Sequence, residues 1–113
     1  MTNSADAERR ILSSAVEDYT GLWELLWELS TARSGGVSNA DRALAETALR
    51  SLLDRGWVAL YRGREFAGEE QPVPAMEFDS VLAQDESWSE PAKGAIQVRV
   101  AATQAGEDEF RRT

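Results

Sequence analysis

Neither cysteine nor histidine occurs in this chain of 113 residues. Without cysteine there are no disulfides, thiolate metal sites or cysteine nucleophiles, and without histidine there is no imidazole base or ligand. An apolar core must therefore hold the fold together alone. The hydrophobic fraction of 42% is ordinary for a globular chain. We expect one domain over residues 5–112, after a flexible tail at residues 1–4.

Hydrophobic periodicity predicts two helices at the start of the chain, at about residues 5–18 and 22–31. Thr20 is a suitable N-cap for the second of them. This second helix carries Trp23 and Trp27, four residues apart, beside four leucines. Such a composition is typical of a helix that is buried within its domain or covered by another chain.

A third helix is predicted from Ser38, its N-cap, to about Arg55. Gly56 follows it and suits the left-handed position that ends many helices. Two strands are predicted at residues 57–62 and 96–101, from their β-branched and aromatic content. We expect the two strands to pair as an antiparallel ribbon.

Alternation along these strands predicts which side chains face the core. Ile96, Val98 and Val100 fall on one face of the second strand. Val58 and Leu60 of the first strand are expected to face the same core.

All of the net charge of −8 lies in one segment, residues 65–90, which has eight acidic residues and no Lys or Arg. The rest of the chain is neutral, with twelve residues of each sign. A net negative charge opposes non-specific attraction to nucleic acid and to anionic lipid, unless a local basic patch overrides it. Within this segment we expect a short helix at residues 75–83, and Trp88 folding back onto the body.

Two stretches resemble the winged helix-turn-helix superfamily, which includes many small bacterial regulators. Residues 48–58 (ALRSLLDRGWV) look like the end of the third helix and the first wing strand, and residues 98–107 (VRVAATQAGE) are similar to a closing strand followed by Thr-x-x-Gly. The resemblance implies a mainly α fold with a small antiparallel β-ribbon: three helices, a two-stranded wing and a short C-terminal helix at residues 103–112. Residues 63–95, an unusually long acidic wing, depart from the family.

In the DNA-binding members of that superfamily, the third helix enters the major groove. The candidate nucleic-acid contacts are Asn39, Arg42, Arg50, Arg62, Arg64 and Arg99. These cations have two interpretations, contact with phosphates or neutralisation of the neighbouring acidic segment. Glu46 and Asp54, four residues to either side of Arg50, already give it local partners.

Aromatic residues are the candidates for a protein interface, because tryptophan and tyrosine are enriched at interaction hot spots. The candidates are Trp23, Trp27, Trp57, Tyr61 and Trp88. Each of the tryptophans is alternatively a core residue. Trp57 and Tyr61 share the outer face of their strand, and they form an exposed aromatic pair if no helix covers it.

No catalytic motif is present: the glycines match neither a dinucleotide nor a P-loop pattern, and no serine has an activating context. We therefore predict a non-enzymatic binding module with no cofactor and no metal. A protein with a basic surface is the favoured partner, and a homodimer is considered as well. The alternative is a bacterial DNA-binding transcriptional regulator. The chain shows neither a secretory signal nor a membrane span, so a cytoplasmic location and no membrane partner are expected.

Overall fold

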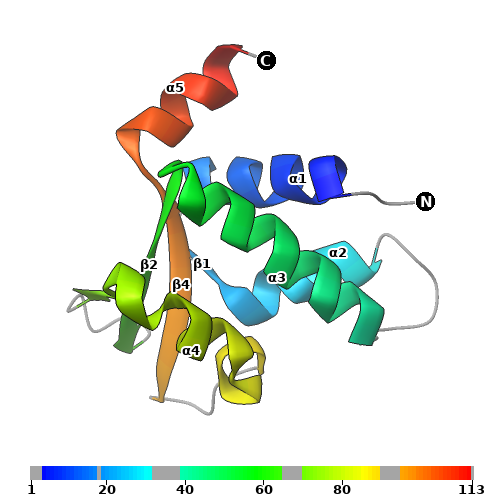
Figure 1. Cartoon of the computed structure of the whole chain (residues 1–113), viewed down its shortest axis with the longest axis vertical. Coiled ribbons are helices and arrows are strands. Elements are labelled where there is room, and N and C mark those ends of the chain that lie inside the picture. Colours follow the sequence, from blue (N-terminus) through cyan, green and yellow to red (C-terminus); the bar gives the residue numbers. More distant parts are fainter. Residues whose placement is uncertain (1–3, 18, 32–38, 65–69, 90–94, 113) are drawn as a thin grey trace.

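The computed structural model describes residues 4–17, 19–31, 39–64, 70–89 and 95–112 (Figure 1). The α-helices in these ranges are α1 (Ser4–Glu17), α2 (Leu22–Thr31), α3 (Asn39–Asp54), α4 (Phe78–Ala83) and α5 (Gln104–Arg112). The strands are β1 (Thr20–Gly21), β2 (Val58–Arg64), β3 (Gln71–Pro72) and β4 (Ile96–Ala102), and two 3-10 helices, η1 (Ala75–Glu77) and η2 (Asp85–Trp88), flank α4. The chain is mainly helical with a small antiparallel sheet, as predicted.

The first three helices agree with the sequence prediction to within a residue or two at their ends. Ser4, which we assigned to a flexible tail, is instead the first residue of α1. Gly56 has a φ of 74° directly after α3, so its predicted role in ending that helix is confirmed. The predicted N-cap Ser38 lies outside the described residues.

The sheet contains four strands in the order β1-β4-β2-β3, and the prediction of two strands was wrong. The predicted pair forms its centre, with an antiparallel register from Val58 opposite Ala102 to Arg64 opposite Ile96. The two extra strands have two residues each, too few to produce a recognisable alternation. Thr20, predicted as an N-cap, belongs to β1 and pairs with Val100 of β4.

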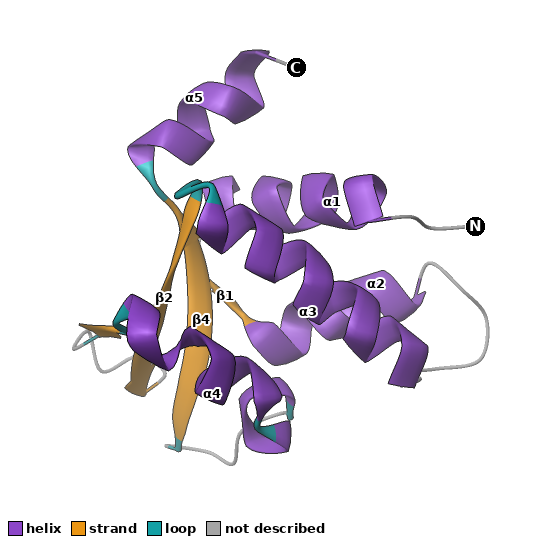
Figure 2. Ribbon diagram, viewed as in Figure 1, coloured by secondary structure: helices purple, strands orange, loops and turns teal. Residues whose placement is uncertain are grey.

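Helices α1, α2 and α3 lie together beside the sheet, and the core forms where they meet it (Figure 2). Val58, Leu60, Val98 and Val100 are buried there, as predicted. Ile96 is instead 61% exposed, because it lies at the end of the β2–β4 ribbon. Alternation places residues on one face of a strand, but burial requires that other elements cover that face.

The acidic segment folds back against the helices over residues 70–89. The predicted short helix is confirmed as η1 followed by α4, and Trp88 is 5% exposed, which confirms that it folds back. Val81 and Leu82 of α4 are also buried. The described part of this segment is therefore packed into the core and does not extend from it as a wing.

Helix α5 is attached through its first turn. Thr103 is its N-cap, because Thr103 Oγ1 accepts a hydrogen bond from the Gly106 backbone N–H at 3.1 Å. The Thr103 backbone N–H donates to the Trp57 carbonyl at 2.9 Å. A Cβ at Gly106 would lie 1.9 Å from the same carbonyl oxygen, so glycine is what allows the close approach. Further along the helix, Phe110 packs against the core, and α5 lies above α1 in Figure 1.

Candidate functional site

Four arginines predicted to contact nucleic acid are paired with carboxylates of the acidic segment. The ion pairs are Arg42–Asp85, Arg50–Asp79, Arg62–Glu77 and Arg99–Glu70. The cations come from α3, β2 and β4, and all four carboxylates come from residues 70–85. Of the two interpretations left open by the sequence, this geometry matches neutralisation of the acidic segment.

Arg42 makes the largest number of these contacts. Its guanidinium pairs with Asp85 and donates to the carbonyl oxygens of Leu82 and Ala83, at 3.4 and 3.2 Å. Its Cζ also lies 5.8 Å from the centroid of the Trp88 ring, within cation–π range. The hydrogen bond to Asp85 raises the pKa of Arg42 above its ordinary value. Arg42 thus ties the end of α4 and the start of η2 to α3.

The cover over α3 is anchored by apolar side chains as well as by ion pairs. Val81, Leu82 and Trp88 are each at most 5% exposed. Exposing three such side chains would cost on the order of 5–8 kcal/mol, comparable with the whole stability of many domains. Exposed ion pairs contribute less, roughly 0–1 kcal/mol each. The segment is therefore a constitutive part of the fold.

The other two nucleic-acid candidates lie at the ends of their elements. Asn39 is exposed at the first residue of α3. Arg64 is the last residue of β2, opposite Ile96.

Each of the five aromatic candidates occupies a different environment. Trp88 is in the core, and its indole N–H donates to the Leu82 carbonyl at 2.9 Å, so a partner has no access to it. Trp23 is half-buried and donates to Gln97 Oε1 at 3.2 Å, whereas Trp27 is 60% exposed.

Trp57 and Tyr61 do not form the pair expected from the sequence. Residues four apart on a strand are separated by about 13 Å. Tyr61 instead packs edge-to-face against Tyr19, with ring centroids 5.4 Å apart. The residue before β1 was missed as a partner because nothing in the sequence around Tyr19 predicts that short strand. Trp57 lies elsewhere, at a hollow between α1 and α5.

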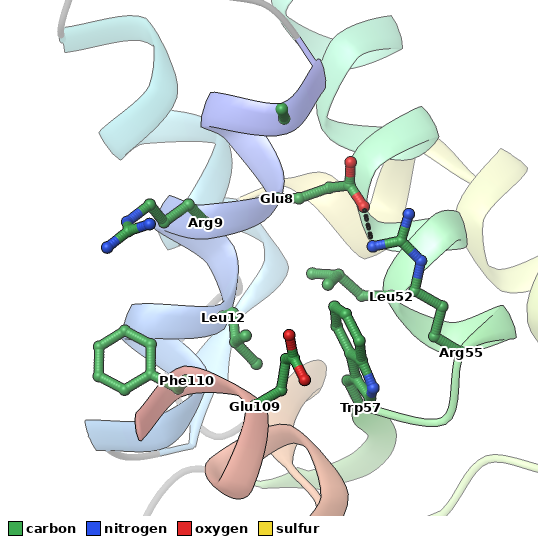
Figure 3. Close-up of a pocket in the computed structure, with 9 residues that line it drawn as sticks. Glu8, Arg9, Leu12, Leu52, Arg55, Trp57, Glu109 and Phe110 are labelled. Carbon is green, nitrogen blue, oxygen red and sulfur yellow. Dashed lines mark ion pairs between the residues drawn. The ribbon is translucent and has the colours of Figure 1, made fainter. Parts of the chain in front are cut away.

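This hollow has a volume of about 230 Å³ and is open to solvent on one side. Its apolar lining consists of Ala5, Leu12, Leu52, Trp57 and Phe110, and its charged lining of Glu8, Arg9, Arg55 and Glu109. Figure 3 shows Trp57 and Phe110 on opposite sides of the hollow, with Arg9 pointing away from its centre. Of these residues, the sequence analysis proposed only Trp57 for binding, because the hollow forms from three segments far apart in the chain.

One wall of the hollow already holds a cation. Arg55 Cζ lies 4.9 Å from the centroid of the Trp57 ring, and its Nη1 lies 3.2 Å from Glu8 Oε1. The Glu8 side chain is only 16% exposed. Its Oε1 is buried and accepts no hydrogen bond of good geometry from the described residues. An aromatic face and a carboxylate together bind a guanidinium at this wall.

Within the described ranges, no three acidic side chains come close enough together to hold a metal ion. No helix among them is long and apolar enough to cross a membrane. Neither the known family models, nor the curated proteins, nor the solved structures include a match to this chain.

Proposed function

We propose that this chain is a non-catalytic, winged-helix-type domain that binds a protein with a basic surface. The observation that carries the proposal is that Arg42, Arg50, Arg62 and Arg99 are each paired with a carboxylate of residues 70–85. A DNA-reading helix presents such cations to phosphates and bases. Here the acidic segment lies over them and is anchored in the core.

The order α1, α2, α3, β2, β4 supports the winged-helix part of the proposal. The overall charge of −8 supports a basic partner, because complementary charge accelerates association and selects among partners. The hollow at Trp57 supplies an aromatic site of the kind found at interaction hot spots.

Affinity capture of the intact chain from cells that produce it, with and without nuclease, tests this proposal. We expect a complex with a basic protein that survives nuclease treatment and weakens as the salt concentration rises. Recovery of DNA, with loss of all captured protein after nuclease treatment, would instead support the transcriptional regulator. Capture of no protein at any salt concentration would also contradict the proposal.

A further inference from the structure

The two walls of the hollow between α1 and α5 are chemically alike. On one wall, Trp57 and Glu8 hold the guanidinium of Arg55. On the other, α5 places a second aromatic ring and a second carboxylate, Phe110 and Glu109, at the same hollow (Figure 3). The first wall shows that an aromatic ring and a carboxylate of this hollow hold a guanidinium.

We infer that the hollow receives an arginine side chain of the partner protein, which packs against Phe110 and pairs with Glu109. This inference rests on the proposed function and names the side chain that the site recognises. An arginine suits it better than a lysine, because a planar guanidinium stacks on an aromatic face while it pairs with a carboxylate.

The size of the hollow favours a side chain over a free small molecule. Its volume of about 230 Å³ is below the range of roughly 300–1,000 Å³ that is common for pockets enclosing drug-sized ligands. Leu12 and Leu52 close its inner side, so the apolar stem of an arginine is covered while its charged end reaches the carboxylates.

The present partner of Glu109 is easily replaced. Glu109 Oε2 lies 3.4 Å from Arg112 Nη1, and the Arg112 side chain is 75% exposed. Such a surface pair contributes little to stability, so an incoming guanidinium can take its place. The rim also carries the cation Arg9, which repels an incoming guanidinium. Removing the charge of Arg9 therefore tests whether the bound group is a cation.

The test is an NMR titration of the full chain with a short soluble peptide that contains a single arginine between two leucines. The control peptide carries citrulline, which keeps the shape of arginine without its charge. We expect saturable shifts of the backbone signals of Glu8, Glu109 and Phe110 and of the Trp57 indole. The citrulline peptide should bind roughly fivefold to tenfold more weakly, as expected for loss of a cation–π contact and a charge-assisted hydrogen bond.

Two variants of the protein test the same site, because they should change the affinity for the arginine peptide in opposite directions. Glu109→Gln should weaken binding of the arginine peptide roughly twofold to fivefold, and Arg9→Gln should strengthen it by a similar factor. Asp108→Asn is the matched control, because Asp108 lies on the same helix but does not line the hollow, and it should leave the affinity unchanged.

Equal binding of the two peptides, or no saturable shift at millimolar peptide, would overturn the inference. Shifts confined to residues 70–89 would also overturn it, while the proposed function would still stand. Failure of the capture experiment, by contrast, would remove the proposed function itself.

Discussion

At the scale of single residues, Arg42 links α3 to residues 82–85 of the acidic segment. It caps the carbonyl end of α4, pairs with Asp85 and covers one face of the Trp88 ring. Its side chain is 23% exposed, so these contacts are partly shielded from solvent. A residue predicted to contact DNA is thus used to hold the acidic segment in place.

Arg42→Ala should lower the free energy of unfolding by about 1–2 kcal/mol, because it removes hydrogen bonds from a charged donor to two carbonyls as well as an ion pair. Arg42→Lys should recover less than half of this loss, since an ammonium lacks the planar fork of donors. Urea unfolding measures both. Arg112→Ala, which removes a surface pair, is the control and should change stability by less than about 0.5 kcal/mol. Equal losses for the two alanine variants would contradict the role given to Arg42.

Gly106 is the residue that lets α5 reach the body of the molecule. Gly106→Ala places a methyl group against the Trp57 carbonyl, and it should cost about 1–3 kcal/mol and loosen α5. Urea unfolding measures the cost, and amide hydrogen exchange of residues 104–112 measures the loosening.

Gly56→Ala is the comparison for this variant. No atom lies within 4 Å of a Cβ at Gly56, so its cost, about 1–2 kcal/mol, comes only from the left-handed φ. The exchange rates of α5 should stay unchanged in Gly56→Ala. If amide exchange in α5 were faster in Gly56→Ala but not in Gly106→Ala, Gly106 would not be the residue that holds the helix.

At the scale of whole elements, local signals in the sequence predicted the helices and the central strands. The run of apolar residues in α3, the glycine after it and the N-cap at Thr103 each act within a few residues of the feature that they specify. Strand β1 was missed because its two residues are defined by the edge of β4, which lies 80 residues away in the sequence.

The candidate site was less predictable because it too depends on contacts between residues far apart in the sequence. A helical pattern places Arg50 on the polar side of α3 and Arg42 near its start, but it does not show which segment covers these side chains. The total charge of residues 65–90 made neutralisation one of two interpretations, and only the fold shows which carboxylate meets which arginine. The hollow was missed because α1, the turn after α3, and α5 meet only in three dimensions.

Trp88→Ala should destabilise the protein by about 3–5 kcal/mol, because it opens a cavity under the acidic segment. Trp27→Ala removes a side chain that is 60% exposed and should cost less than about 1 kcal/mol. Thermal or urea unfolding of both variants compares a buried with an exposed tryptophan. A small effect of Trp88→Ala would show that η2 is not part of the core.

At the scale of the whole molecule, folding brings together side chains of opposite charge that are far apart in the sequence. The sequence contains an acidic segment and separate arginines on three elements, and the fold brings them together in pairs. These four arginines are thereby engaged within the chain, while the net charge of −8 remains. This arrangement predicts poor affinity for DNA, and we propose the aromatic hollow as the site for a partner.

The most direct test is a fluorescence anisotropy titration of a labelled random DNA duplex with the intact protein, at about 50 mM and 200 mM salt. We expect no binding up to about 10 μM protein at either salt concentration, far above the range typical of specific complexes. Binding that weakens roughly a hundredfold between the two salt concentrations would indicate about four phosphate contacts. If that binding were also lost in Arg42→Gln with Arg50→Gln, α3 would be a DNA-contacting helix, and the central claim that the acidic segment withholds these arginines would be wrong.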